Sequence, residues 1–304
     1  MEVISTVEEF RAAKAKRRGE WGLVPTMGYL HAGHLSLVER AHKENEFVAV
    51  SIFVNPTQFG PNEDLAAYPR DLERDLKLLE SLDVDLVFNP LPEVMYPPHY
   101  QTYVTVEEVT KYLEGASRPT HFRGVATVVT KLFNIVGAER AYFGQKDAQQ
   151  TIVIKRMVQD LNMPIDIIIC PTQREADGLA LSSRNTYLDE EHRRAAPVLY
   201  RALNAAKAAF DRGERAGDRL RAIMREVIEA EPLAKIDYVS AADATTLEEL
   251  GLEPPPQPPA LFRGPPVKTG EGVLLSMAVR VGKPRLIDNF LYENGKWLTG
   301  ELAS

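Results

Sequence analysis

The chain has 304 residues, of which 44% are hydrophobic and 26% are charged, and this composition is typical of a folded globular protein with one large and one smaller domain. It argues against an intrinsically disordered chain and against a membrane protein. The net charge of −7, from 36 basic and 43 acidic residues, argues against generic nucleic-acid binding, so any anion site must be built from local basic and backbone groups.

The first part of the chain predicts an alternation of strands and helices. Short apolar runs predict strands, and apolar residues at helical spacing predict helices. The clearest helix is 125–136, with apolar residues at positions 125, 128, 129, 132, 133 and 136. The other expected elements are strands at 21–24, 47–54, 84–88, 140–143 and 165–170, and helices that begin at 35 or cover 69–82 and 147–161. This order predicts an α/β protein with an open parallel sheet, whose ligands bind beyond the carboxyl ends of the strands.

After about residue 175 the pattern changes and predicts a second domain. The expected elements are helices at 189–211 and 216–230, and strands at 236–240, 273–281 and 285–288, with a turn at 282–283. The segment 253–272 holds seven prolines, which argue against a helix or a central strand and predict an exposed loop. We therefore expect an N-terminal domain at 1–175 and a C-terminal domain at 176–304.

Cys170 is the only cysteine, so the chain cannot form an internal disulfide or a cysteine metal cluster. It closes an apolar run, where a thiol acts as a small hydrophobic side chain. The first residues have no apolar core of signal-peptide length, and no stretch of the sequence is long and apolar enough to span a membrane. We therefore expect a cytoplasmic protein with no membrane partner.

The first candidate site is 25–34, where a short buried strand is expected to lead into a helix. His31 and His34 stand at or just before the helix start, where unpaired N–H groups and the helix dipole favour an anion. Gly28 and Gly33 let the chain bend and let a ligand approach the backbone. The same segment is also compatible with half of a zinc site or with a polar surface turn.

The second candidate site is 144–150, again between an expected strand and an expected helix. Here Lys146 can reach a phosphate group, while Asp147 can cap the helix or contact a ribose or a metal ion. The alternative is a helix start that carries ordinary solvated charges.

The third candidate site is the polar loop 174–185. Arg184 offers planar donors to a phosphoryl group, and Ser182 and Ser183 add hydroxyl donors in a loop that can close over a nucleotide. The alternative is a surface turn that caps the following helix. The sequence contains neither the dinucleotide-binding glycine pattern nor a P-loop, so the three segments together predict a nucleotide site of the His-x-Gly-His type.

Six segments, taken in order, resemble the signature of the pantothenate synthetase family, which belongs to the His-x-Gly-His nucleotidyltransferases. The resemblance runs nearly from end to end of the chain. The segments are Pro-Thr-Met-Gly-Tyr-Leu-His-Ala-Gly-His (25–34), Ser-Ile-Phe-Val-Asn-Pro-Thr-Gln-Phe (51–59), Tyr-Pro-Arg (68–70), Pro-Thr-His-Phe-Arg-Gly-Val (119–125), Gly-Gln-Lys-Asp-Ala-Gln-Gln (144–150) and Arg-Glu-Ala-Asp-Gly-Leu-Ala-Leu-Ser-Ser-Arg-Asn (174–185).

The resemblance implies a Rossmann-like doubly wound parallel sheet, with a smaller C-terminal α+β domain that closes over the active site. It implies the ATP-dependent condensation of (R)-pantoate with β-alanine to give pantothenate, AMP and pyrophosphate, through a pantoyl-adenylate intermediate. It also implies Mg²⁺ with ATP as co-substrate, and a homodimer with small-molecule substrates. The ligands of the metal stay unknown.

The resemblance further implies roles for individual residues. His34 is implied as the proton donor, and attack on the α-phosphate of ATP calls for His31, Lys146 and Arg184 around the phosphoryl oxygens. Gln58 and Gln150 are implied to hold pantoate, with Gln58 also near β-alanine. The residues implied to bind ATP are Met27, Gly28, Tyr29, Leu30, His31, Ala32, Gly33, His34, Gly144, Gln145, Lys146, Asp147, Gln173, Leu181, Ser182, Ser183 and Arg184.

The sequence departs from the family pattern in three places. Gln145 stands where glutamate is common, Leu181 stands where methionine is common, and the proline-rich segment looks longer than usual. None of these changes removes a charged catalytic group. Two other functions stay open: a nucleotidyltransferase of the same superfamily with another acceptor, and an ATP-binding protein without catalysis. Neither gives a reason for the two glutamines at 58 and 150.

Overall fold

A computed structural model describes residues 1–61, 63–251 and 272–302, which fall into two compact units. The first unit holds Met1–Gln173 together with Leu181–Ser183, and the second holds Arg174–Ala180 and the described residues from Arg184 onward. The chain therefore leaves the first unit, returns to it for three residues, and leaves it again. The short strand β7 (Gln173–Arg174) and the 3-10 turn η4 (Ser183–Tyr187) lie in this crossing segment.

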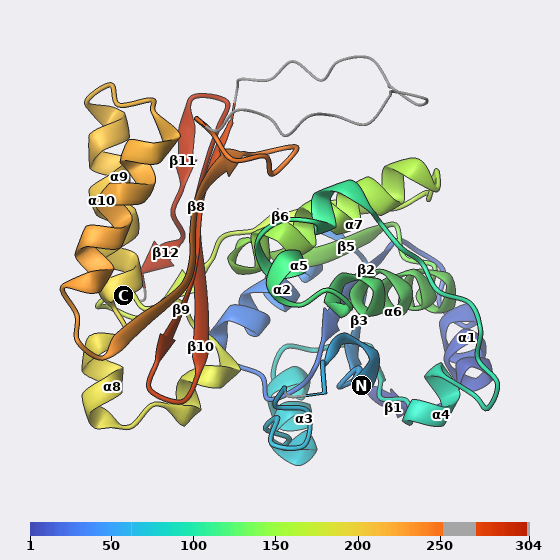
Figure 1. Cartoon of the computed structure of the whole chain (residues 1–304). Coiled ribbons are helices and arrows are strands. Elements are labelled where there is room, and N and C mark those ends of the chain that lie inside the picture. The colour runs from blue at the N-terminus through green and yellow to red at the C-terminus, as the bar shows by residue number, and fades with distance from the viewer. Residues whose placement is uncertain (62, 252–271, 303–304) are drawn as a thin grey trace. The chain divides into compact units, whose positions relative to one another are not determined.

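The first unit is built on a six-stranded sheet in which all neighbouring strands are parallel (Figure 1). The strand order is β1-β4-β3-β2-β5-β6. The strands are β1 (Glu2–Ile4), β2 (Trp21–Thr26), β3 (Phe47–Ile52), β4 (Leu86–Phe88), β5 (Arg140–Gly144) and β6 (Asp166–Cys170). The central strands are buried along almost their whole length, as a parallel sheet covered on both faces requires. The predicted α/β class is confirmed.

Helices cover both faces of this sheet. One face packs against α2 and α3 through a buried apolar cluster, and on the other face α6 packs against both α1 and α7 (Figure 1). The helices are α1 (Val7–Ala15), α2 (Ala32–Glu44), α3 (Leu72–Glu80), α4 (Pro92–Met95), α5 (Leu113–Ser117), α6 (His121–Val136) and α7 (Ala148–Asp160), with 3-10 turns η1 (Pro56–Gln58), η2 (Glu108–Thr110) and η3 (Gln145–Asp147).

The strand order reverses between β2 and β5. From β2 the chain builds β3 and β4 on one side, and it then crosses to the other side of β2 to build β5 and β6. The loop after β2 leads to α2 and the loop after β5 leads to α7, on opposite faces of the sheet. Open α/β sheets bind their ligands beyond the carboxyl ends of two such strands. The segments 25–34 and 144–150 both lie at this point of the fold.

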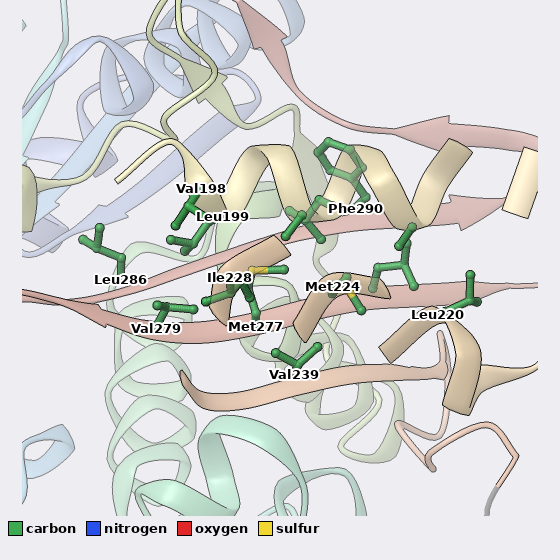
Figure 2. Close-up of a cluster of buried hydrophobic side chains, with 14 of the residues drawn as sticks. Val198, Leu199, Leu220, Met224, Ile228, Val239, Met277, Val279, Leu286 and Phe290 are labelled. Carbon is green, nitrogen blue, oxygen red and sulfur yellow. The ribbon is translucent and has the colours of Figure 1, made fainter. Parts of the chain in front are cut away.

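The second unit packs α9 and α10 against a four-stranded antiparallel sheet with the order β11-β10-β9-β8. Figure 2 shows the interface, where Leu220, Met224 and Ile228 of α10 and Val198 and Leu199 of α9 meet apolar side chains of the strands. The elements are α8 (Glu190–Ala195), α9 (Val198–Asp211), α10 (Gly217–Glu229), β8 (Ala234–Asp243), β9 (Val273–Val281), β10 (Arg285–Glu293), β11 (Lys296–Leu298) and β12 (Glu301–Leu302). Within the described part of the chain, no helix is both long and apolar enough to cross a membrane.

The single helix expected at 189–211 is wrong. The chain forms α8 and then α9, because Pro197 lies between them and has no N–H with which to continue the helical hydrogen bonds. The helix expected from residue 69 begins only at Leu72, where the side chain of Asp71 caps it by accepting the N–H of Arg74 at 3.1 Å.

Three other expected elements are longer than predicted. The helix expected at 125–136 begins at His121, the strand expected at 236–240 extends over 234–243, and β10 continues to Glu293. The sequence analysis assigned no element to α1 or β1. The expected proline-rich loop lies outside the described residues, apart from Gly272.

Candidate functional site

A buried carboxylate from α3 holds the loop that follows β2. Asp75 is 1% exposed, and its two oxygens accept the N–H groups of Tyr29 and Leu30, each at 2.7 Å. Gly28 and Tyr29 have φ values of 81° and 51°, so the chain turns sharply here, and glycine meets the first of these positions without steric cost. A β-carbon at Gly28 would lie 3.1 Å from an oxygen of Asp75. The turn therefore depends on the glycine and the carboxylate together.

This contact changes the electrostatics expected of the loop. The N–H groups of Tyr29 and Leu30, which precede the N-cap His31 of α2, face Asp75, so they are not among the helix-start N–H groups that the sequence assigns to an anion. Burial raises the pKa of Asp75, although the two N–H bonds and Arg74 oppose this rise. The Arg74 guanidinium lies 3.5 Å from the carboxylate and 5.2 Å from the centre of the Tyr29 ring. A ligand at this loop would therefore be held by other donors than these two N–H groups.

His31 and His34 follow this turn at the start of α2. His31 caps the helix, since its Nδ1 accepts the N–H of Gly33 at 3.2 Å, and the Nδ1 of His34 accepts the N–H of His31 at 3.4 Å. The two ring centres are 4.1 Å apart. Because each Nδ1 is an acceptor, we assign the proton of each neutral ring to Nε2. Both rings can then act as Nε2–H donors.

Both histidines are neutral near pH 7. Burial, assisted by His34 and Lys146, lowers the pKa of His31 to about 2. Burial, assisted by Lys146, lowers the pKa of His34 to about 4. Lys146 lies in the loop after β5, and β5 is the parallel neighbour of β2, so the loops that carry the first two predicted segments leave the same edge of the sheet. The pair contributes directional donors rather than positive charge.

The loop after β5 carries the ammonium group of this region. The Nζ of Lys146 lies 3.2 Å from an oxygen of Asp147, and their side chains are 20% and 43% exposed. Asp147 precedes α7 but its side chain makes no capping hydrogen bond. A β-carbon at Gly144 would meet no atom within 4 Å, so the space beside this residue is open. Gly144 therefore leaves the backbone at the carboxyl end of β5 accessible to a ligand. Gln145, the next residue, is buried.

Part of the third predicted segment, 181–183, lies in the first unit, where Ser183 contacts the loop after β2. The N–H of Leu181 donates to the carbonyl of Gln173 at 2.9 Å, and the hydroxyl of Ser183 donates to the carbonyl of Tyr29 at 3.3 Å. Leu181, Ser182 and Ser183 thus belong to the first unit. Arg184 belongs to the second unit, so the structure does not place it beside the histidines.

Gln58 lies in η1, directly after β3, and contacts the first loop. Its Nε2 lies 3.2 Å from the sulfur of Met27, and its Oε1 accepts a hydrogen bond from the Nδ2 of Asn55 at 3.0 Å. Asn55 is 1% exposed and also caps η1, since its Oδ1 accepts the N–H of Thr57 at 3.3 Å. The Gln58 side chain is therefore fixed by the residue three positions before it.

The backbone of Gln58 is held as firmly as its side chain. Its carbonyl accepts hydrogen bonds from the Nδ1 of His121 at 2.9 Å and from Arg118 at 3.2 Å. Arg118 also pairs with Glu63 and approaches the Nε2 of His121 at 3.3 Å. Since a carbonyl only accepts and a guanidinium only donates, His121 carries its proton on Nδ1. Burial, followed by the charge of Arg118, lowers the pKa of His121 to about 4.

The two glutamines of the second segment have different surroundings. Gln149 is buried, and its side chain bonds the backbone of Val109, Tyr112 and Glu114, each at 2.8 Å. It therefore holds the segment before α6 in place. Gln150 is half-buried on α7 and is the glutamine to which the family resemblance implies a role in substrate binding.

Among the described residues, no three His, Cys, Asp or Glu side chains gather as a metal site. Mg²⁺ that arrives on nucleotide phosphates needs only one or two protein carboxylates, and its first shell is completed by water and phosphate oxygens. Asp147, beside Lys146, is the carboxylate in this region that fits such a role.

The structure thus gathers most of the predicted residues at the carboxyl ends of the strands of the first unit. They are Met27, Gly28, Tyr29, Leu30, His31, Ala32, Gly33, His34, Gln58, Gly144, Gln145, Lys146, Asp147, Gln150, Gln173, Leu181, Ser182 and Ser183. The sequence analysis missed two supporting residues. Asp75 is a charged residue four positions before the buried Leu79 on one helix, and Asn55 is an amide directly after a buried strand. Either pattern gives a weak signal by itself.

Comparisons with known proteins identify the family of the chain. The family model described as pantoate-beta-alanine ligase matches residues 2–291. The pantothenate synthetase of Roseiflexus castenholzii is 59% identical over 293 residues, which cover 96% of this chain and 100% of that protein. The pantothenate synthetase of Chloroflexus aggregans is 60% identical over 291 residues, covering 96% of this chain and 99% of that protein.

Solved structures give the same result. The crystal structure of pantothenate synthetase from Thermus thermophilus has a TM-score of 0.86 and 48% identity, with coverage of 95% of this chain and 98% of that one. The pantoate-beta-alanine ligase of Francisella tularensis, described as a complex with beta-gamma ATP and beta-alanine, has a TM-score of 0.74 and 36% identity, with coverage of 96% and 97%. The fold and site define a nucleotide-dependent ligase of the α/β class. The chain belongs to the pantoate–β-alanine ligase family.

The histidine assignments predict a pH response. An unfolded histidine has a pKa of 6.5, whereas the pKa values of His34 and His121 are about 4 in the folded chain. Between pH 6.5 and 4 the unfolded chain therefore binds more protons, so this part of the stability is complete above pH 6.5 and is lost as the pH falls toward 4. We expect the melting temperature to fall between pH 7.5 and 5, and the fall to be smaller in His121→Asn.

Nuclear magnetic resonance of ring nitrogens tests the same assignments directly. At pH 7.5 we expect His31 and His34 as the Nε2–H form and His121 as the Nδ1–H form, and we expect no titration of these rings down to pH 5. A ring that gains a proton with a midpoint near 6.5 would contradict the assignment for that residue.

A second prediction concerns Asp75→Asn. An asparagine side chain has one acceptor oxygen, so its NH₂ group would face one of the two N–H groups that the carboxylate now accepts. We expect amide exchange at Tyr29 and Leu30 to accelerate at least ~10-fold, as the loss of a hydrogen bond to a charged group predicts. Hydrogen–deuterium exchange of the peptide around these residues measures this.

Asp85→Asn is the matched control, because Asp85 also accepts a backbone N–H, that of Val48, at 2.8 Å in the same unit. Its exchange effect should be confined to the region of β3. Equal protection of Tyr29 and Leu30 in Asp75→Asn and the unaltered chain would show that the carboxylate does not hold this loop.

Proposed function

We propose a residue-level account of how this ligase works. The chain condenses pantoate with β-alanine at the expense of ATP, and it yields pantothenate, AMP and pyrophosphate through a pantoyl-adenylate. The observation that carries the account is the meeting of His31, His34 and Lys146 where the strand order reverses.

In the first step the carboxylate of pantoate attacks the α-phosphorus of ATP, an acyl–phosphate bond forms, and pyrophosphate leaves. A carboxylate has a pKa near ~4 and is already ionised at neutral pH, so this step needs no general base. The site has to orient the reactants and to stabilise the charge that collects on the phosphoryl oxygens and on pyrophosphate.

The donors for this charge come from two loops. We assign the Nε2–H groups of His31 and His34 and the ammonium group of Lys146 to the phosphoryl oxygens. The depressed pKa values keep both rings neutral, so they donate hydrogen bonds and retain their protons. Lys146 then supplies positive charge at this position. The open space at Gly144 lets the nucleotide approach the end of β5. The role of Arg184 stays a prediction.

We assign Gln58 and Gln150 to pantoate. Amide groups orient the hydroxyl and carboxylate oxygens of a substrate without adding a charge that competes for a metal ion. The bond from Asn55 holds the Oε1 of Gln58 toward Asn55, so the NH₂ group of Gln58 points away from Asn55 and can donate to an acceptor oxygen. In the second step the neutral amine of β-alanine attacks the acyl carbon, the amide bond forms, AMP leaves, and the amine loses a proton to solvent.

The remaining assignments follow from the family resemblance. We propose that Mg²⁺ accompanies ATP and that, when bound, it would neutralise phosphate charge. The resemblance does not give the ligands of the metal; Asp147, beside Lys146, is a carboxylate that would fit this role. We propose that Gln173 and Leu181 to Ser183 contact ATP, and that the protein is a cytoplasmic homodimer.

An assay with each substrate omitted in turn tests the reaction. We expect pantothenate, AMP and pyrophosphate only when ATP, pantoate and β-alanine are all present, and pyrophosphate with pantoyl-adenylate when β-alanine is left out. Mass spectrometry identifies the products. A dinucleotide product would instead indicate a transferase with another acceptor, and bound but unconverted ATP would indicate a binding protein.

Loss of either donor should slow the first step. We expect His34→Ala and Lys146→Ala to lower pantoate-dependent pyrophosphate release at least ~100-fold, the usual effect of removing one donor that stabilises developing charge. Lys155→Ala is the matched control, because Lys155 is exposed on α7, the helix that follows the Lys146 loop. Pyrophosphate release at the control's rate in Lys146→Ala or His34→Ala would remove that residue from the mechanism.

A further inference from the structure

Tyr96, which directly follows α4, bonds the residues that hold the side chain of Gln58. The Tyr96 hydroxyl donates to the Oδ1 of Asn55 at 2.8 Å and lies 3.1 Å from the hydroxyl of Thr57. We propose that Tyr96 is a positioning residue for pantoate, which acts by fixing the Asn55 amide and through it the Gln58 amide. This inference rests on the assignment of Gln58 to pantoate in the proposed function.

The orientation of the Asn55 amide follows from its partners. Its Nδ2 faces the carbonyl of Gly124 at 3.1 Å, which can only accept, and its Oδ1 faces the N–H of Thr57 at 3.3 Å, which can only donate. An exchange of the nitrogen and oxygen would break both bonds. The Tyr96 hydroxyl bonds the same Oδ1 and therefore supports this orientation.

The Asn55 amide then determines which end of Gln58 faces a ligand. Its Nδ2 donates to the Oε1 of Gln58 at 3.0 Å, so the Gln58 NH₂ group points away from Asn55 and toward the sulfur of Met27. The group of the substrate that binds here must be a hydrogen-bond acceptor, such as a hydroxyl or carboxylate oxygen. A rotated Gln58 amide would face that oxygen with its own carbonyl and repel it.

The backbone around the network leaves little room for adjustment. A β-carbon at Gly124 would lie 2.4 Å from the carbonyl oxygen of Thr57 and 2.7 Å from the Cα of Gln58. Helix α6 therefore approaches η1 at backbone distance, and only glycine permits this contact. Arg118 and His121 also bond the backbone carbonyl of Gln58, so the backbone of this residue is held in place. What remains to be fixed is the rotation of its side-chain amide, and other side chains fix this by hydrogen bonds.

The Tyr96 ring is held independently of its hydroxyl. It packs edge-on against Tyr100 at 5.1 Å and lies 6.3 Å from Phe53, and Lys131 approaches it at 6.0 Å. Burial raises the pKa of Tyr96 to about 12, so the hydroxyl keeps its proton throughout the working range of pH. Removal of the hydroxyl alone should leave the ring in place and delete one donor to Asn55.

Steady-state kinetics of Tyr96→Phe, with Tyr100→Phe as the matched control, test the inference. Tyr100 belongs to the same group of aromatic rings, but the hydroxyl that bonds Asn55 comes from Tyr96. We expect Tyr96→Phe to raise the KM for pantoate about 3- to 10-fold, the effect of losing one neutral hydrogen bond, with kcat and the KM for ATP unchanged. Tyr100→Phe should leave all three constants near those of the unaltered enzyme.

Three other results would overturn the inference. If Tyr96→Phe and Tyr100→Phe have the same KM for pantoate while Gln58→Ala raises it, Tyr96 has no positioning role and the proposed function stands. If Gln58→Ala leaves the KM for pantoate unchanged, the assignment of Gln58 fails and the role of Tyr96 fails with it. If Tyr96→Phe changes kcat and both KM values together with its melting temperature, the hydroxyl supports the fold in general rather than the pantoate site.

Discussion

The reversal of strand order between β2 and β5 is the constraint on which the candidate site depends. In a parallel sheet each strand delivers its following loop to the same edge, and neighbouring strands lie only about 4.8 Å apart. Residues more than 100 positions apart in the chain, such as His34 and Lys146, therefore meet without any long loop to bring them together. The positive charge of Lys146 is accordingly one of the causes that lower the pKa of both histidines. The order of the strands brings the loops of the site together, and the residue types in those loops then determine its chemistry.

The site favours neutral, directional donors over an accumulation of positive charge. Two partly buried imidazolium rings 4.1 Å apart would repel one another, and the positive charge of Lys146 would add to the repulsion. Asp75 uses up the two N–H groups that an anion could have taken, and in return it fixes the loop that carries the rings. Gln58 adds an amide of fixed orientation. In the proposed reaction most of the compensating charge then comes from Lys146 and from the metal that ATP carries.

The sequence predicts an element well where its apolar residues repeat at helical or strand spacing and are buried. It predicts less well where a single residue determines where a helix ends. The helix at 125–136 was predictable because its apolar face is buried over its whole length, whereas the helix expected at 189–211 breaks at one proline. The loops after β2 and β5 were predictable because histidine, lysine and glycine stand at strand ends. Asp75 and Tyr96 were not, since their partners lie 45 and 41 positions away and no local pattern records such contacts.

The third signature segment contains at least one residue whose role is structural. Arg174, its first residue, is 1% exposed, and its guanidinium forms two bonds with Asp288 at 2.6 and 2.8 Å and lies over the rings of Tyr200 and Phe290. Because these partners occupy the guanidinium of Arg174, it is not a candidate for binding a phosphate. It instead holds the turn that begins the segment, where it donates to the carbonyl of Gly178 at 3.0 Å. The buried ion pair therefore holds the start of the segment within the second unit, while the proposed nucleotide contacts fall on residues from Leu181 onward.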